Sequence, residues 1–188
     1  MATTKTLFLL DAYALIFRAY YAFINNPVKN SKGMNTSPML GFTNSLYEIL
    51  KNQDPSHIAV AFDFPGPTFR TEIYSEYKTN RPPTPEDIKM AVPYIKNIIS
   101  GFNIPIYEIE GYEADDIIGA LAKKAENKGY KVYMMTSDKD YCQLVSENIA
   151  LYKPKRSGSE VEIWGVEEVK KKFLVDTPVQ VIDVLSLW

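Results

Sequence analysis

The sequence predicts an α/β protein in which a central, mostly parallel sheet is covered by helices on both faces. Three observations lead to this prediction. Short apolar runs at residues 6–10, 57–62 and 131–136 have the length and composition of buried strands. Amphipathic stretches lie between these runs, and strands that alternate with helices usually form a parallel sheet. The 188 residues, 46% of them hydrophobic, suffice for one sizeable core.

The first strand, TLFLL, is apolar throughout and is followed directly by a polar residue. Apolar residues at helical spacing then predict a helix over 12–23. Ser37 followed by Pro38 is typical of an N-cap with proline at the first helical position, so we expect a second helix from there to the Asp-Pro pair at 54–55. The run HIAVAF at 57–62 is the second strand.

Residues 65–85 form the least regular part of the sequence. Five prolines bracket a stretch of aromatic and basic side chains, and we expect no packed secondary structure there. Tyr77 and Lys78, with Arg70 and Arg81 nearby, suit contact with nucleic-acid phosphates and stacking on bases. An ordinary surface loop with solvated charges explains the same residues equally well.

A helix is predicted over 84–101, where apolar residues again recur at helical spacing. Pro93 should kink this helix or move its start, and Gly101 should end it. Residues 104–109 follow as a third strand. Pro105 favours an edge position for this strand, because proline cannot donate a hydrogen bond to a sheet ladder.

The clearest helical pattern covers residues 113–128, with Gly129 just beyond its end. KVYMMT at 131–136 is the fourth strand. Residues 149–153 and 160–164 flank a Gly/Ser turn and therefore predict a hairpin. Two short helices are expected to complete the chain.

Composition excludes several classes of site. The single cysteine, Cys142, rules out an internal disulfide and a CxxC zinc site. The single histidine, His57, argues against a histidine metal cluster or a Ser-His-Asp triad. No apolar run is long enough for a membrane span, and the N-terminus lacks a signal-peptide pattern, so we expect a cytoplasmic protein. The net charge of -2 argues mildly against a nucleic-acid partner, although the basic residues are clustered.

Acidic residues follow three of the predicted strands. Asp11, Asp63 and Asp138 come after the first, second and fourth strands, whose carboxyl ends meet at one edge of a parallel sheet. The run GYEADD, with Glu113, Asp115 and Asp116, begins a helix at the same edge, and Asp140 adds a seventh carboxylate. Each acid alone is explained as well by a helix cap or by the helix dipole. Seven of them at one edge favour a shared site.

So many like charges need a counter-charge. Oxygen ligands without histidine or cysteine suit Mg²⁺ or Mn²⁺. Two such ions favour in-line displacement at a phosphoryl group. The sequence therefore predicts a two-metal phosphoryl-transfer site at this edge. An aspartyl-phosphate phosphatase also uses an aspartate after a strand, but its second aspartate is replaced here by Tyr13.

Three long stretches of the sequence match a known family: LFLLDAYALIFRAYYA, AVAFDFPGPTFRTEIYSEYKTNRPPTPED and PIYEIEGYEADDIIGALAKKAENKGYKVYMMTSDKDYCQLV. Together they resemble the 5′-3′ exonuclease domain of bacterial DNA polymerase I, a member of the flap endonuclease family with a PIN-like fold. The resemblance covers nearly the whole chain. It implies a three-layer fold with a mobile arch near 65–85, and a metal-dependent nuclease that cuts 5′ flaps and removes RNA primers.

The resemblance also implies roles for individual residues. The metal-binding acids would be Asp11, Asp63, Glu113, Asp115, Asp116, Asp138 and Asp140. The DNA-binding residues would be Arg18, Arg70, Tyr77, Lys78 and Arg81. The residues most directly involved in catalysis would be Lys78, Arg81, Asp115 and Asp138. Tyr77 would stack on a base, and Lys78 with Arg81 would engage the scissile phosphate.

The family pattern continues with a further acidic motif and a helix-hairpin-helix region, whereas this chain stops at Trp188. We therefore expect residues 1–188 to be a fragment with an incomplete second metal site. We expect the full-length protein to carry a polymerase domain, to be monomeric and nucleoid-associated, and to act on 5′ ends, 5′ flaps and RNA primer–DNA hybrids. A catalytically impaired DNA-binding fragment and a PIN-type ribonuclease remain alternatives.

Overall fold

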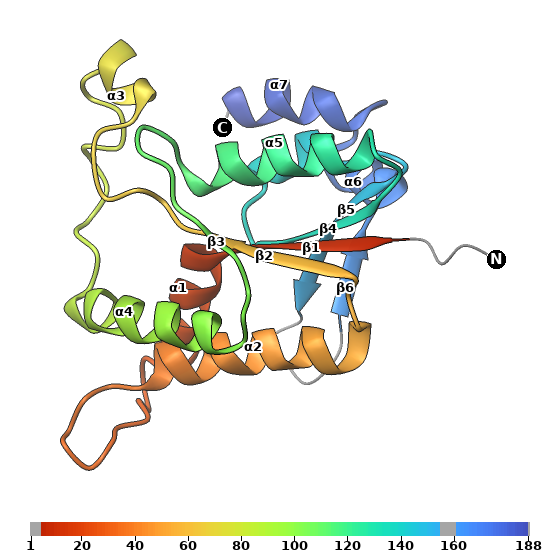
Figure 1. The fold of residues 1–188 in the computed structure, drawn as a ribbon. Coiled ribbons are helices and arrows are strands. Elements are labelled where there is room, and N and C mark those ends of the chain that lie inside the picture. The colour runs from red at the N-terminus through yellow and green to blue at the C-terminus, as the bar shows by residue number, and fades with distance from the viewer. Residues whose placement is uncertain (1–4, 155–160, 188) are drawn as a thin grey trace.

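The computed structural model describes residues 5–154 and 161–187 of the chain. Its centre is a six-stranded sheet with strand order β3-β2-β1-β4-β5-β6 (Figure 1). Every neighbouring pair is parallel except β5 and β6, which are antiparallel. The strands are β1 (Thr6–Asp11), β2 (His57–Ala61), β3 (Ile106–Tyr107), β4 (Lys131–Met135), β5 (Ile149–Pro154) and β6 (Val161–Trp164).

Helices cover both faces of the sheet, which gives the three layers that the sequence predicts (Figure 1). One face carries α1 (Ala12–Ala22), α2 (Ser37–Gln53) and α4 (Glu86–Gly101). The other carries α5 (Ala114–Glu126), α6 (Val166–Phe173), α7 (Val181–Ser186) and the 3₁₀ turns η1 (Asp140–Leu144) and η2 (Pro178–Gln180). No helix among the described residues is long and apolar enough to cross a bilayer; the longest, α2, has 17 residues.

Strand β1 divides the core between the two faces. Phe8 and Leu10 pack with α1, α2 and α4, whereas Leu9 packs with α5 and the C-terminal helices. All three side chains are essentially inaccessible, as period-two alternation in a strand buried on both sides requires. The register places Leu10 beside Val60 of β2 and Met135 of β4. The carboxyl ends of these three strands therefore lie next to one another.

One predicted helix boundary is confirmed and another needs correction. Helix α4 runs from Glu86 to Gly101, so Gly101 ends it as predicted, and Pro93 lies inside it without moving its start. The left-handed residue after α4 is Asn103, with φ of 56°. Ser37 is the first residue of α2 and Thr36 precedes it as N-cap; the Ser37 hydroxyl instead accepts a hydrogen bond from the Val28 N–H at 2.8 Å.

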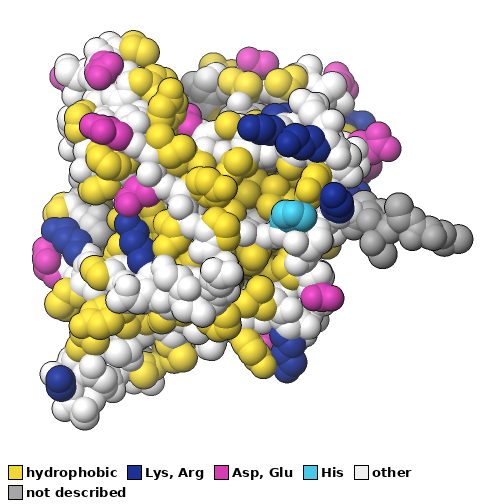
Figure 2. Space-filling view, viewed as in Figure 1, with side chains coloured by type: hydrophobic (Ala, Val, Ile, Leu, Met, Phe, Trp, Pro, Cys, Tyr) yellow, Lys and Arg dark blue, Asp and Glu magenta, His cyan; other side chains and the backbone are white. Residues whose placement is uncertain are grey.

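The third strand is shorter than expected, since β3 comprises only Ile106 and Tyr107, but it lies at the sheet edge as Pro105 predicts. Hydrophobic side chains cover this edge between α5 and α4 (Figure 2). An apolar hollow of about 250 Å³ opens there, lined in part by Tyr107 and Leu121, with His57 also on its wall. The predicted hairpin is confirmed by β5 and β6, and its turn at 155–160 lies outside the described residues.

Candidate active site

The carboxyl edge of the sheet holds a cavity of about 620 Å³. Residues from β1, from the segments after β2 and β4, and from the start of α5 line it. The acids on its wall are Asp11, Asp63, Glu113, Asp115, Asp138 and Asp140. Six of the seven acids singled out in the sequence thus face one space, and the parallel register of β1, β2 and β4 explains why.

Asp11 is one of two buried acids in this set, with 8% of its surface exposed against 6% for Glu113. One carboxylate oxygen accepts a hydrogen bond from the Ala14 N–H at 3.0 Å and so caps α1. The other accepts from the Thr136 hydroxyl at 3.0 Å and the Tyr141 hydroxyl at 3.3 Å. Burial, with the charges of Asp63 and Asp138, raises the pKa of Asp11 to about 6. Asp11 is therefore both a helix cap and a member of the acidic site.

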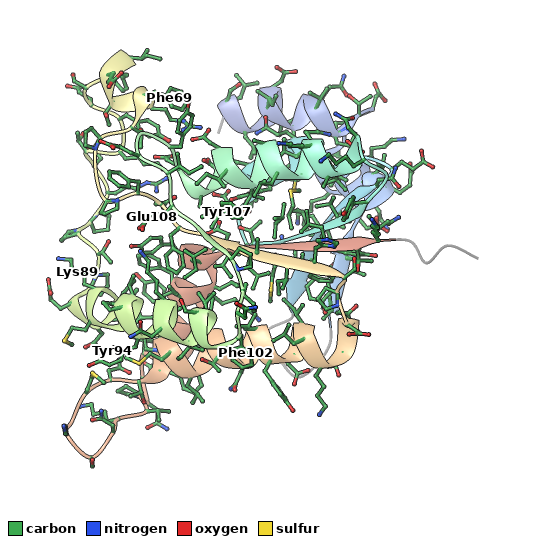
Figure 3. The ribbon with its side chains drawn as sticks, viewed as in Figure 1. Phe69, Lys89, Tyr94, Phe102, Tyr107 and Glu108 are labelled. Atoms are coloured by element: carbon green, nitrogen blue, oxygen red, sulfur yellow. The ribbon has the colours of Figure 1, made fainter. Side chains whose placement is uncertain are left out.

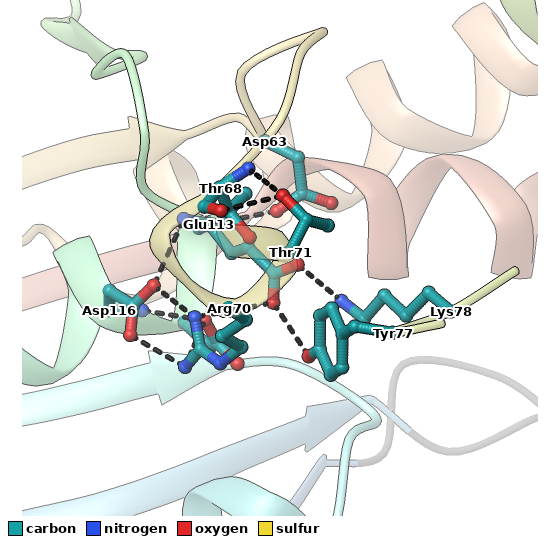
Figure 4. A network of polar contacts seen from close by, with 10 residues as sticks. Asp63, Thr68, Arg70, Thr71, Tyr77, Lys78, Glu113 and Asp116 are labelled. Carbon is teal, nitrogen blue, oxygen red and sulfur yellow. Dashed lines mark hydrogen bonds and ion pairs between the residues drawn. The ribbon is translucent and has the colours of Figure 1, made fainter. Parts of the chain in front are cut away.

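Asp63 and Glu113 meet at the start of α5. Asp63 accepts a hydrogen bond from the Ala114 N–H at 2.7 Å, which satisfies a free donor of the first helical turn. Glu113 is the N-cap residue of α5, and its carboxylate binds the Lys78 ammonium at 2.7 Å and the Tyr77 hydroxyl at 3.2 Å. Figure 4 shows this network from close by.

Asp115, Asp138 and Asp140 complete the acidic wall. Asp138 accepts a hydrogen bond from the Asp140 N–H at 3.0 Å, which fixes the turn into η1. Burial raises the pKa of Asp115 and the charge of Asp116 adds to this shift. Burial and the charge of Asp138 raise the pKa of Asp140. Each raised pKa means that the carboxyl group is harder to ionise than a free aspartate, because it is partly buried and lies beside other acids.

Asp116 is the exception, because it is not among the described residues that line the cavity. Its two oxygens accept hydrogen bonds from the Arg70 guanidinium at 2.6 and 2.7 Å. Burial alone would raise the pKa of Asp116, but the hydrogen bonds from Arg70 and from the Glu113 N–H, with the charge of Arg70, lower it. The structure thus turns Asp116 toward Arg70, and Asp116 lies with Asp115 and Asp140 on a smaller hollow beside the cavity.

Residues 65–85, called the arch below, line one side of the cavity and contain secondary structure that the sequence did not predict. A short helix, α3 (Phe69–Ile73), forms within this segment. Arg70 of α3 and Lys78 beyond it pair with acids at the start of α5. Tyr77, Lys78 and Arg81 line the cavity. These long-range contacts explain why local proline content wrongly predicted an unpacked loop.

Lys78 has an unusual backbone conformation, with φ of 60° in the left-handed region. Such a conformation costs a non-glycine residue roughly 1–2 kcal/mol, and the ion pair with Glu113 offsets part of this cost. Burial lowers the pKa of Lys78, but its hydrogen bond and charge interaction with Glu113 raise it above the ordinary value. The side chain therefore stays protonated over the cavity.

Two other residues from the sequence analysis lie elsewhere. Arg18 is half-buried on α1 and is not among the described residues lining the cavity. Glu108, part of the acidic run in the sequence, pairs with Lys96 at 2.7 Å near β3, where Figure 3 labels it. Sequence reasoning also missed Thr136 and Tyr141, which hold Asp11. The sequence signal that could have pointed to them is their closeness to the predicted site acids, since Thr136 lies two residues before Asp138 and Tyr141 directly follows Asp140.

The donor set of the cavity matches a hard divalent cation. All six acids offer oxygen, and burial, with a smaller contribution from neighbouring acids, raises the pKa values of Asp11, Asp115 and Asp140. Among the described residues, no three acidic, histidine or cysteine side chains are already arranged as metal ligands. The ligand atoms of the six acids thus suit a hard cation, but their side chains are not arranged around one in this structure. The Lys78 ammonium, 2.7 Å from Glu113, supplies part of the positive charge.

Comparison with known proteins identifies the family. The model of the 5′-3′ exonuclease, N-terminal resolvase-like domain matches residues 6–174. The chain belongs to this family. The exonuclease-domain resemblance expected from the sequence is thereby confirmed, and the matched residues include all seven acids and the whole arch.

Relatives of this exonuclease domain include both short and long proteins. The chain is 40% identical over 183 residues to a 5′-3′ exonuclease of Aquifex aeolicus (strain VF5), covering 97% of this chain and 61% of that protein. It is 37% identical over 183 residues to DNA polymerase I of Bacillus caldotenax, covering 97% of this chain and 20% of that protein. The chain thus spans about three fifths of the first relative and one fifth of the second.

The fold has a counterpart among solved structures. The bacteriophage T5 flap endonuclease, in a pseudo-enzyme–product complex with DNA and metal ions, superposes with a TM-score of 0.70 at 19% identity. The match covers 95% of this chain and 64% of that one. The expected PIN-like arrangement of the exonuclease domain is therefore confirmed.

Proposed function

We propose that this exonuclease domain hydrolyses phosphodiester bonds in DNA at 5′ ends and 5′ flaps. The observation that carries the proposal is the cavity at the carboxyl edge of the sheet. Acids from four separate segments face it, and Lys78 and Arg81 line the same space. A negatively charged site covered by cations suits a bound metal and a phosphate together. Membership of the 5′-3′ exonuclease family supports the same activity.

The six cavity acids would hold the divalent cation, which we propose is Mg²⁺ or Mn²⁺, with a second ion nearby. The family resemblance implies Asp116 as a member of this set as well, but its pairing with Arg70 makes it the weakest candidate. When bound, the ions would lower the pKa of a water molecule and neutralise charge on the phosphate. The raised pKa values of Asp11 and Asp115 fit such a role, because a cation would favour their ionised forms.

The arch residues would act on the substrate directly. Lys78 and Arg81 would bind the scissile phosphate and stabilise the charge that builds on it. The Lys78 ammonium has three N–H donors, so it could keep its contact with Glu113 at 2.7 Å and still donate to the phosphate. The Tyr77 ring, whose hydroxyl binds Glu113, would stack on a base beside the cut.

We infer the partners from the relatives. The T5 flap endonuclease was crystallised with DNA, and DNA polymerase I of Bacillus caldotenax is about five times as long as the matched region. We therefore propose that the natural substrate is DNA with a 5′ end or flap, including an RNA primer paired with DNA. We further propose that the chain works as a monomer at the nucleoid and within a longer polypeptide that carries a polymerase.

A cleavage assay tests the proposal. A 5′-labelled flap duplex is incubated with the chain and Mg²⁺ or Mn²⁺, and compared with the Asp115→Asn, Asp138→Asn double variant. We expect metal-dependent product from the chain and at least a hundredfold slower cleavage by the variant. Asp183→Asn, which neutralises an exposed acid on α7, is the matched control and should cleave normally. Equal cleavage by the double variant would remove these acids from the mechanism. Salt-dependent flap binding without any product would instead indicate a binding module.

A further inference from the structure

The basic residues of the arch differ in what they bind. Lys78 and Arg81 line the cavity, whereas Arg70 is not among the described residues that do so. Arg70 instead forms a bidentate pair with Asp116, with N–O distances of 2.6 and 2.7 Å (Figure 4). Such a pair uses both oxygens of the carboxylate and fixes the plane of the guanidinium.

The surroundings of Arg70 fix its orientation further. The guanidinium lies over the Phe69 ring at 4.6 Å and near the Tyr77 ring at 5.9 Å. The Phe69 N–H also donates a hydrogen bond to the Gly111 carbonyl at 3.1 Å. The base of the arch is therefore attached to the segment before α5 through backbone, and to α5 itself through Asp116.

Asp116 has a second partner on its own side of this contact. Its Oδ2 atom accepts a hydrogen bond from the Glu113 N–H at 3.0 Å as well as from Arg70. The same carboxylate thus orders the backbone of Glu113 and holds the arch. Glu113 in turn binds Tyr77 and Lys78. Arg70 also lies 3.6 Å from Glu113 and 3.9 Å from Asp115, so the pair adjoins the acids of the cavity wall without lining the cavity itself.

We propose that Arg70 and Asp116 are a positioning pair that clamps the base of the arch onto the start of α5, so that Lys78 and Arg81 lie over the cavity. This inference deepens the proposed function and rests on it. Asp116 then serves as an anchor for the arch and Arg70 as its counterpart. Neither side chain acts as a metal ligand or a contact to DNA.

The first test needs neither metal nor DNA. Chymotrypsin cleavage after Tyr77 is followed by mass spectrometry in the native chain, in Arg70→Gln, in Asp116→Asn and in the double variant. We expect each single variant to be cut about tenfold faster, and the double variant no faster than either. Lys96→Gln, which breaks the ion pair with Glu108 outside the arch, is the matched control. Unchanged rates, or rates that multiply in the double variant, would overturn the clamp.

The second test separates an anchor from a ligand. Mn²⁺ binding is measured by isothermal titration for Asp116→Asn and Asp138→Asn. The clamp predicts that Asp116→Asn binds Mn²⁺ within about threefold of the native chain, whereas Asp138→Asn binds at least tenfold more weakly. Equal weakening by both variants would make Asp116 a ligand and overturn the inference. Normal binding by Asp138→Asn would defeat the metal site of the proposed function, and the proteolysis result would still decide the clamp.

Flap cleavage provides a third readout that a purely structural role would not move. We expect Arg70→Gln to lower kcat about tenfold with little change in KM, and Arg70→Lys, which keeps the charge but loses the bidentate geometry, to be intermediate. In a Lys78→Gln background, Arg70→Gln should cause no further loss, because it acts through Lys78. Losses that multiply would show that Arg70 acts independently of Lys78 and contradict the inference.

Discussion

The acidic wall and the basic arch that faces it are held in place by different means. Asp11, Asp63 and Asp138 accept hydrogen bonds from backbone N–H groups at the ends of strands and the starts of helices. Lys78 and Arg70 are held mainly by ion pairs with acidic side chains. Backbone hydrogen bonds therefore position these three acids, whereas the position of the arch depends on the charges of Glu113 and Asp116.

The two regions also compensate one another electrically. Burial and mutual repulsion raise the pKa values of several wall acids. The hydrogen bonds and charges of Asp116 and Glu113 raise the pKa values of Arg70 and Lys78. The arch thus supplies part of the positive charge that the wall requires. A substrate or metal that enters the cavity must compete with this internal pairing.

The largest contrast between the two regions should be in stability. Leu10, directly before Asp11, is fully buried, whereas Ile73 in α3 is 82% exposed. We expect Leu10→Ala to lower the free energy of unfolding by about 2–5 kcal/mol, because it leaves a cavity beneath the site. Ile73→Ala should change it by less than about 0.5 kcal/mol. Urea unfolding measures both, and similar losses from the two variants would break the distinction between a rigid wall and a loosely held arch.

The next contrast separates two lysines in similar ion pairs. Lys78 and Lys96 each lie 2.7 Å from a glutamate, but only Lys78 is among the described residues lining the cavity. We expect Lys78→Gln to slow flap cleavage about a hundredfold, because it removes a cation from the phosphate site. Lys96→Gln should leave the rate within about twofold. If single-turnover assays give equal effects, the arch has no special place in the reaction.

The smallest effect is a gain in stability from removing a wall charge. The pKa of Asp11 rises from an ordinary value near 3.8 to about 6 in the folded chain. Between these values the unfolded state releases its proton first, so the free energy of unfolding falls as pH rises from about 4 to 6. Asp11→Asn, which keeps a capping side chain, should therefore stabilise the metal-free chain at pH 7 by about 1–3 kcal/mol.

Thermal unfolding of both proteins across this range checks the pH dependence. The difference between Asp11→Asn and the native chain should be small at pH 4, grow to pH 6 and then level off. A difference in stability that is constant with pH would show that the pKa of Asp11 is not raised in the folded state.

The sequence predicted the wall far better than the arch. The strand runs that end near Asp11, Asp63 and Asp138 identify both the sheet and its functional edge, because local periodicity and parallel topology determine them. The pairing of Arg70 with Asp116 joins residues 46 positions apart. Local patterns contain no information on such a contact. For the same reason α3 was missed, since a five-residue helix depends on tertiary contacts more than on propensity.

The most direct test of the account is the position of a bound metal. Crystals of the chain soaked in Mn²⁺ are measured at a wavelength that gives an anomalous manganese signal. We expect a peak inside the cavity, beside Asp11, Asp63 and Asp138, with Asp116 still paired to Arg70. A peak at Asp116, or none among the cavity acids, would contradict it.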